Sequence, residues 1–312
     1  MRKFLADVHM HADFDPERGT WHGERPEKIA ERIVHGTELD LCALTEHNKV
    51  SDQYFNVRDE IDRQSEIYFH RHGIRRDVWM MLGFELAVLF AERRYHIGFV
   101  FDEEFFRGSL PDVSATRINV EELEDYRVDF PGVVILNHPT WKDSTPRERE
   151  ITREFMGSGY VEGVEILNGS AVMYQNGRSK VTGETANLFV DVRRRQEAAK
   201  RAAHHRDQPV RQPIAPIGSS DAHKAAIIGS AATEYYGNSK TDFFDAVRRG
   251  TTRVVPIEQN VVLPHLIEVQ RSIQYLSKYL SIPKFAHKDD RARRHKRRRH
   301  HFDRGSDEAE GS

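Results

Sequence analysis

Two of the 17 histidines stand two positions apart in the first apolar run of the sequence. Residues 7–11 read DVHMH and have the character of a β-strand, in which alternate side chains point to the same side. His9 and His11 could then reach one ion, because neutral imidazole is a common ligand of divalent metals. Asp7 could serve instead by hydrogen bonding to a ligand and orienting it. The pair therefore predicts a metal site where this strand ends.

Two other segments carry an acid close to an imidazole. The segment GSSDAH places Asp221 and His223 two positions apart after a turn of small residues. The acid Glu46 directly precedes His47 where the apolar run LDLCALT ends, and we interpret His47 as the potential ligand. A mixed set of imidazoles and carboxylates suits Zn, Mn or Fe and disfavours a pure Mg or Ca site.

Three further residues stand next to apolar runs. Glu85 follows VWMMLGF, where a buried charge is costly unless it is paired or bound to metal. A carboxylate can also bridge two ions, which a neutral imidazole cannot. His96 opens the run YHIGFVF, and His138 follows VVILN, where Pro139 stops the strand as the side chain should project. These residues extend the predicted metal site to several separate segments.

Eight short runs rich in β-branched and aromatic residues are candidate strands. They cover residues 5–9, 39–45, 78–84, 95–101, 133–137, 161–167, 213–218 and 252–256. Helical segments lie between many of them, such as 26–36, where Pro26 suits a first helical turn. This alternation predicts a parallel sheet buried on both faces. When such a sheet closes into a barrel, the active site lies at the rim formed by the carboxyl ends of the strands.

Composition supports a globular domain and excludes several classes of protein. A chain of 312 residues with 38% hydrophobic content is long enough to bury a full core. The single cysteine, Cys42, excludes a disulfide framework and a multi-cysteine zinc site, and we expect it in the core. No apolar run approaches the roughly 20 residues of a membrane span, and no signal peptide is evident. We therefore expect a cytoplasmic protein.

Charge distinguishes the body from the C-terminal tail. Residues 284–312 carry ten Lys/Arg against six Asp/Glu, a net charge of +4, so that the rest of the chain has about −6. An acidic body disfavours a general nucleic-acid binder. Basic residues also gather over 193–206 of a predicted helix, 184–206, which could face phosphate or a partner. We expect residues 265–280 to form a closing helix and the basic tail from 284 to be disordered.

Seven motifs, in order and at matching spacings, resemble the PHP superfamily of polymerase and histidinol phosphatase domains. The motifs are DVHMHAD, LTEHN, GFE, YHIGF, NHP, VEILN and GSSDAH, and the resemblance covers roughly residues 4–256. It implies a distorted (β/α)7 TIM-like barrel, an α/β fold whose rim binds up to three divalent metals. In this reading residues 1–258 form the barrel with a long insertion at about 169–212, followed by a helical segment, 259–283, and the tail.

The resemblance implies three metal sites that share one bridging carboxylate, Glu85. The first would be held by His9, His11, Glu85 and Asp221, the second by Glu85, His96 and His138, and the third by His47 and His223. Catalysis would depend most on His9, His11, Glu85, Asp221 and His223.

The family adds one more Asp or His to the third site, from the loop after the first motif. His22 has the best position relative to the next helix, while Asp15 and Asp13 lie nearer to the first motif and stay as alternatives. Four residues are expected to hydrogen-bond the ligands without binding metal themselves: Asp7, Glu46, Glu165 and Asn168.

The chemistry implied is hydrolysis of a phosphate ester by water that two or three divalent ions activate. The substrate would be a phosphorylated small molecule or a nucleic-acid end. The basic helix and the tail leave open a nuclease within a larger complex, or a protein partner. A non-catalytic regulatory module stabilised by metal is a further alternative. An amide hydrolase on a similar barrel ranks last, because no bridging lysine is evident in the motifs.

Overall fold

A computed structural model describes residues 1–12, 24–105, 118–140, 144–170, 179–204 and 213–256. The predicted closing helix, the segment 259–283 and the basic tail lie outside these residues. Among the described helices, none is long and apolar enough to cross a membrane.

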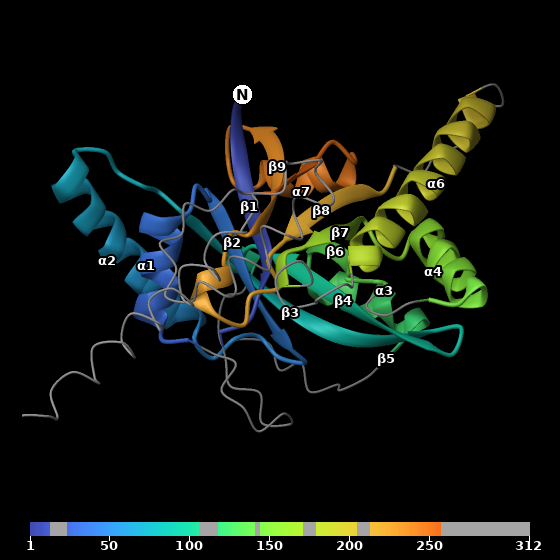
Figure 1. The fold of residues 1–312 in the computed structure, drawn as a ribbon, viewed down its shortest axis with the longest axis horizontal. Coiled ribbons are helices and arrows are strands. Elements are labelled where there is room, and N and C mark those ends of the chain that lie inside the picture. Colours follow the sequence, from blue (N-terminus) through green and yellow to red (C-terminus); the bar gives the residue numbers. More distant parts are fainter. Residues whose placement is uncertain (13–23, 106–117, 141–143, 171–178, 205–212, 257–312) are drawn as a thin grey trace, which may run out of the picture.

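One mixed sheet curves into a nearly closed barrel, which confirms the predicted α/β barrel (Figure 1). Its strands lie in the order β10-β9-β1-β2-β3-β4-β6-β7-β8, and β5 pairs with β3. The strands are β1 (Arg2–Met10), β2 (Leu41–His47), β3 (Trp79–Phe90), β4 (Arg93–Phe101), β5 (Ile118–Asn119), β6 (Gly132–Asn137), β7 (Gly163–Asn168), β8 (Ala215–Ser219), β9 (Ala231–Gly237) and β10 (Arg253–Pro256).

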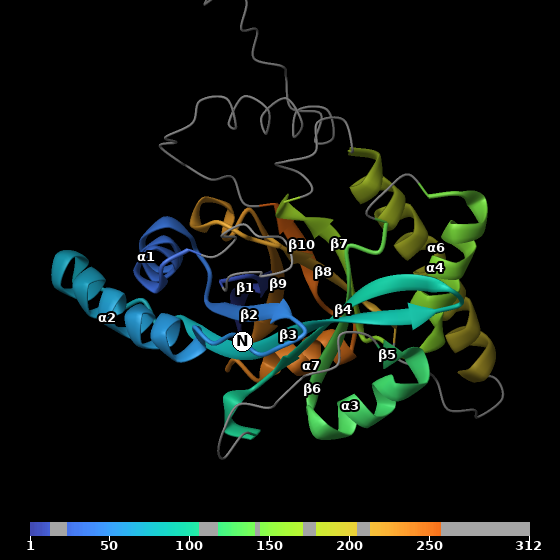
Figure 2. The same ribbon diagram turned by 90° about the horizontal axis from the view of Figure 1, so that it is seen from below.

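Helices cover the outside of the barrel in two groups, with α1 and α2 on one side and α4 and α6 on the other (Figures 1 and 2). The described helices are α1 (Pro26–Gly36), α2 (Tyr54–His72), α3 (Leu123–Asp129), α4 (Pro146–Ser158), α6 (Ser179–His204) and α7 (Asp242–Arg248). Helix α1 begins at the predicted proline and buries Ile29, Ile33 and Val34 on one face. The predicted basic helix is α6, which fills much of the long insertion.

The sheet is mixed, so the expectation of parallel strands throughout was wrong. Strands β1, β2 and β3 are parallel neighbours, as are β6, β7 and β8, but β4 is antiparallel to both β3 and β6. Only Ala91 and Glu92 separate β3 from β4, and both have positive φ, as a two-residue type I′ hairpin requires. A connection this short can join only antiparallel strands. The amino end of β4 therefore lies at the rim with the carboxyl ends of its neighbours.

All eight predicted strands are present; the two-residue β5 was missed, and so was β9. Its sequence, AATEYYG, places Thr233 and Glu234 in the middle of a buried strand. Thr233 Oγ1 donates to the carbonyl of Gly218 at 2.9 Å and accepts from its amide at 3.0 Å. Glu234 lies 3.5 Å from Arg253 and 3.8 Å from Lys3. The hydrogen bonds of Thr233 and the cations near Glu234 offset the burial of these polar groups, which hid the strand from a reading of apolar runs.

The barrel interior is packed with alternate residues of the strands. Phe4, Ala6 and Val8 of β1 share one apolar cluster with Val100 of β4 and with further residues of the neighbouring strands. Phe243 and Val247 of α7 belong to the same cluster, so α7 closes the end of the barrel opposite the rim. An apolar plug below the rim keeps the barrel filled and leaves only the top layer of inward positions for polar side chains.

The close contact between β8 and β9 depends on Gly218. A Cβ at this position would lie 2.6 Å from the carbonyl oxygen of Ala232 and 2.8 Å from Val254 Cγ1. Because both contacts join strands of the barrel, Gly218→Ala should force β8 away from β9 and lower the free energy of unfolding by about 1–3 kcal/mol. Urea unfolding followed by circular dichroism measures the change.

Gly157→Ala is the matched control, since nothing lies within 4 Å of a Cβ at Gly157 and the residue is helical. It should leave stability unchanged or raise it by up to about 1 kcal/mol. Equal free energies of unfolding for the two variants would show that the close contact at Gly218 does not contribute to the stability of the barrel.

Candidate metal centre

Glu85 lies at the centre of a group of imidazoles at the rim. Its side chain is 1% exposed, and Oε1 lies 3.4 Å from His9 Nε2 and 3.3 Å from both His96 Nδ1 and His138 Nε2. Its other oxygen, Oε2, lies 2.7 Å from His47 Nδ1. Four ring nitrogens from strands β1, β2 and β4 and from the end of β6 therefore converge on one carboxylate.

Asp221 is a second such carboxylate, two residues after the end of β8. Its Oδ1 lies 3.3 Å from His11 Nε2 and 3.6 Å from both His9 Nε2 and His223 Nδ1. The two carboxylates thus share His9, and the groups around Glu85 and Asp221 form one continuous cluster.

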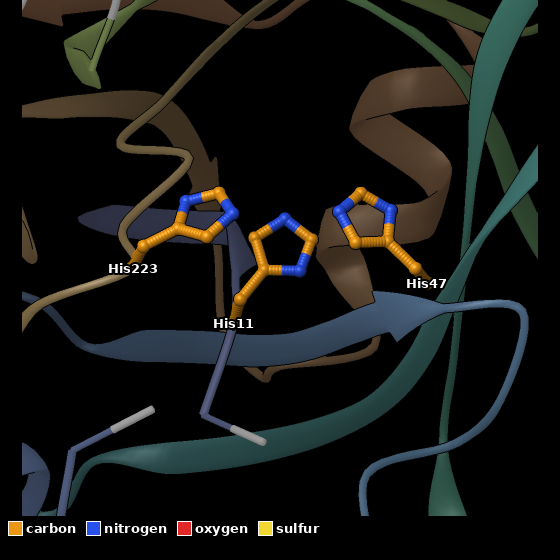
Figure 3. Close-up of side chains that lie close together, drawn as sticks. All are labelled: His11, His47 and His223. Carbon is orange, nitrogen blue, oxygen red and sulfur yellow. The ribbon is translucent and has the colours of Figure 1, made fainter. Parts of the chain in front are cut away.

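Three imidazoles stand in a row on one side of the cluster (Figure 3). The ring of His11 lies between those of His47 and His223, with centroid distances of 4.5 and 4.3 Å. His11 is buried, whereas His47 and His223 are partly exposed. Solvent or a substrate can therefore approach the cluster on the side of His47 and His223.

The structure brings all eight described candidate ligands together. Four sets of three offer ligand atoms within 4.8 Å of one another: His11, His47 and His223; His9, His138 and Asp221; His9, His11 and Glu85; and His47, Glu85 and His96. The remaining candidates, His22, Asp15 and Asp13, lie outside the described residues.

A shift of register in β1 turns both of its histidines toward this cluster. Pairing with β2 shifts between Asp7 and Met10. Val8, before the shift, packs in the barrel interior, whereas Met10, two residues later, packs in the outer apolar cluster under the helices. A bulge of this kind moves the following side chains to the opposite face. His9 and His11 consequently face inward, where an unbroken strand would have placed Met10.

Glu165 of β7 contacts Nδ1 of His9, the ring nitrogen opposite the one that faces Glu85 and Asp221. Its Oε1 lies 3.1 Å from His9 Nδ1 and accepts from Ser219 Oγ, while Oε2 accepts from the amide of His138 at 2.7 Å and from Asn168 Nδ2 at 3.0 Å. An acceptor at Nδ1 fixes the proton there and leaves Nε2 free to face Glu85 and Asp221.

Asp7 and Glu46, the other two acids predicted to support the ligands, also accept hydrogen bonds from backbone amides. Both oxygens of Asp7 accept backbone amides, Ser220 N and Gly229 N, at 2.9 Å each, and so fix the two ends of the loop that carries Asp221. Glu46 accepts from the amide of Ala12 and lies 3.6 Å from His11 Nδ1. Burial raises the pKa of Asp7 to about 6, although the two amides oppose that shift.

Sequence reasoning missed Asn137. Its side-chain amide donates to Glu85 Oε1 at 2.9 Å from the top of β6. A Cβ at Gly98, on the neighbouring strand β4, would lie 3.0 Å from that amide nitrogen, so the glycine leaves room for it. The alternation of side chains along the strand could have identified it, because Asn137 follows Val133 and Ile135 at every second position and these two residues face the barrel interior.

Three residues at the rim have the left-handed backbone that favours glycine. They are Asn48, with φ 57°, His138, with φ 25°, and Asp221, with φ 49°. Each has a hydrogen bond that fixes its backbone: Asn48 N donates to Glu85 O at 2.7 Å, His138 N donates to Glu165, and Asp221 O accepts from Ser170 Oγ at 2.5 Å. Strained backbone of this kind is typical of functional sites.

Charges within the cluster stabilise one another. Burial disfavours the ionised form of Glu85, but the imidazoles, His96 and His9 foremost, outweigh it and hold its pKa well below the usual range. Burial likewise opposes protonation of His11, yet hydrogen bonds with Asp221 and Glu46 raise its pKa to about 9. The carboxylates thus favour the positive charge of His11, whereas burial and the neighbouring His11 lower the pKa of His223 to about 4. A divalent cation would satisfy the same atoms.

Comparison with known proteins agrees with the motifs. Residues 194–252 match a family model described as PHP-associated, and this stretch includes Asp221 and His223. No curated protein matches the chain.

Several solved structures have a similar fold. A two-domain protein from Bacteroides vulgatus, with a predicted PHP-like metal-dependent phosphoesterase, is 13% identical, with 88% of this chain and 70% of that chain covered and a TM-score of 0.45. PsfC from Pseudomonas syringae is 16% identical, with 89% and 100% covered and a TM-score of 0.46. A lesion-specific endonuclease from Pyrococcus furiosus is 12% identical, with 81% and 58% covered and a TM-score of 0.41.

Likenesses this weak carry no argument about the reaction. The family-model match falls on the part of the chain that holds the GSSDAH motif, and the other six motifs precede it in order. The family model therefore matches the part of the chain that contains Asp221 and His223, in agreement with the superfamily that the motifs resemble.

Proposed function

We propose that the protein hydrolyses phosphate esters with water activated by divalent metal ions bound at the rim cluster. The observation that carries this proposal is the buried Glu85 carboxylate, which has four imidazole nitrogens within 3.4 Å. A buried carboxylate surrounded by imidazoles suits a cation that two groups of ligands share. Support also comes from the PHP-superfamily motifs that supply these residues.

The proposed ligand sets follow the spatial groups in the cluster. His9, His11, Glu85 and Asp221 would hold one ion, Glu85 would bridge to a second ion with His96 and His138, and His47 and His223 would hold a third. A further ligand of the third ion would be His22, or Asp15 or Asp13 in its place. Nitrogen and oxygen donors together favour Zn, Mn or Fe over Mg.

Bound divalent ions would lower the pKa of a water molecule toward 7 and offset charge on the phosphoryl and leaving oxygens. The protein's own part is to hold the ligands in place. Glu165 fixes the ring of His9, Asn137 and the imidazoles orient Glu85, and Asp7 anchors the loop of Asp221. No side-chain nucleophile is needed for this reaction.

The substrate class is a phosphate ester, with a phosphorylated small molecule as the first candidate. A nucleic-acid end is the second candidate, because Arg194, Arg195 and Lys200 lie exposed on α6. Phosphate contacts by such residues would make binding fall with rising salt. This dependence distinguishes the two candidates.

Replacing a central ligand should abolish phosphate release. His96→Ala removes the imidazole 3.3 Å from Glu85 Oε1, and we expect turnover to fall more than about 100-fold. The measurement is phosphate release from a panel of monoesters, a diester and 5′-phosphorylated oligonucleotides with Mn, Zn, Fe or Mg. His70→Ala is the control, since His70 lies exposed on α2, outside the cluster. Turnover that survives His96→Ala, or none on any substrate with metal bound, would contradict the proposed reaction.

Glu165→Gln should weaken metal binding without removing a ligand. The amide can accept hydrogen bonds on only one arm, so either His9 or the His138 backbone loses its acceptor, and affinity should fall by roughly 10–100-fold. Titration calorimetry with Mn or Zn measures this change. Glu162→Gln removes the same charge three residues earlier, where Glu162 contacts Arg127 and the amide of Val134 and not the histidines. Equal affinities in the two variants would exclude an orienting role for Glu165.

A further inference from the structure

Helix α6 has one face that the described elements leave partly open. Phe189 and Val192 are buried in the outer apolar cluster, so they hold the helix against the barrel. Val190 lies on a neighbouring face and is 44% exposed. Arg194 and Glu197 follow Val190 at the spacing that places helical side chains in one row. The described part of the chain therefore leaves an apolar side chain of this row open to solvent.

This face forms one wall of a groove of about 510 Å³ between α6 and the barrel. The other wall contains Pro216 of β8 and Thr252, which directly precedes β10. The guanidinium of Arg193 lies between the walls and donates to the carbonyls of Ile214 at 2.8 Å and Gly250 at 3.3 Å. These two bonds join α6 to the chain just before β8 and just before β10, and so they fix the width of the groove.

The groove lies beside the seam of the barrel. Strands β8 and β10 are the two ends of the strand order, and no pairing between them is present among the described residues. Both β1 and β10 are antiparallel to β9, so β10 runs toward the rim as β1 does. A helix that follows a strand ending at the rim returns along the outside of the barrel. The groove between α6 and β10 lies on that path.

The sequence after β10 contains one segment that suits an apolar groove. Residues 265–280 predict a helix with an apolar stripe, whereas the basic tail from 284 has none. The stripe consists of Leu266, Val269, Ile273, Leu276 and Leu280. Burial of these side chains in the groove would remove apolar surface of both partners from water.

The connection from β10 is long enough to reach the groove. Strand β10 ends at Pro256, four residues beyond Thr252, which is roughly 13 Å along a strand. The eight residues 257–264 span up to about 26 Å when extended. A segment attached in this way has an effective concentration of about a millimolar or more, so it binds ahead of a second copy of the chain.

We propose that residues 265–280 dock as a helix in the groove between α6 and β10, with their apolar stripe against Val190 and Pro216. The segment covers the seam between β8 and β10 from the outside. This interaction surface is separate from the metal centre, so its test does not depend on the proposed reaction.

The test measures how fast a cysteine in the groove of the full chain reacts with a charged maleimide. Val190→Cys places a thiol in the groove, and Phe55→Cys places one on α2, where Phe55 has the same exposure of 44%. The native Cys42 is fully buried, so it adds no fast reaction and reports unfolding of the barrel.

Both thiols are measured in the parent chain and together with Ile273→Glu, Ile273→Ala or Gln274→Glu. The first places a charge in the apolar stripe, and the second is a milder change at the same position. Gln274→Glu is the matched control, because it adds the same charge beside Ile273 but outside the stripe. Each rate is measured at two protein concentrations.

In the parent chain Val190→Cys should react at least about tenfold more slowly than Phe55→Cys, because the docked segment must leave before the thiol is reached. Ile273→Glu should bring the two rates within about threefold, since a charge cannot be buried in the groove. Ile273→Ala should act in the same direction to a smaller extent, and Gln274→Glu should change the rate less than about twofold.

Equal rates for the two thiols in the parent chain would overturn the proposal. Slow reaction of Val190→Cys that survives both Ile273 variants would overturn it as well. Slow reaction that is lost on dilution of the protein would assign the groove to a second copy of the chain instead. If Ile273→Glu also exposes Cys42, the comparison of Ile273→Ala with Gln274→Glu decides.

Discussion

Burial of the Glu85 carboxylate is the constraint on which the site depends. An ionised carboxylate that is 1% exposed is tolerated only with charged or hydrogen-bonding partners on both oxygens. These partners are the imidazoles of four segments and the amide of Asn137. The strands must therefore place all of them at the same level along the barrel axis as Glu85. The barrel provides this arrangement, because neighbouring strands place inward side chains in common layers.

Support for the cluster comes from acids that each join two parts of the chain. Glu165 of β7 holds a ring on β1 and the backbone after β6, and Asp7 of β1 holds both ends of the loop between β8 and β9. Each bond spans segments far apart in sequence. The ligands are thus fixed by the same hydrogen bonds that join the strands at the rim, and a change in one acid disturbs both the site and the closure of the barrel.

Eight strands were predictable because each is an apolar run, and the candidate ligands could be expected at one edge of the sheet because they stand at or near the ends of these runs. Sequence reasoning failed where buried polar groups have partners on other strands, with hydrogen bonds at Thr233 and Asn137 and an ion pair at Glu234 of β9. The direction of β4 was also missed, since a hairpin turn made of Ala91 and Glu92 lacks the usual glycine or asparagine. Spatial pairing, which one sequence does not contain, decides all of these features.

Antiparallel β4 has a consequence for the shape of the rim. Parallel strands end at the rim, so their residues beyond the ligands belong to loops that turn away. Strand β4 instead enters the rim from outside, and β3 extends past Glu85 to meet it in the hairpin. Its inward face therefore continues beyond the metal centre as ordered strand. Because the hydrogen bond between Tyr95 and Thr152 and the stacked rings of Phe90 and Phe155 join the hairpin to α4, it forms a rigid wall beside the metal centre.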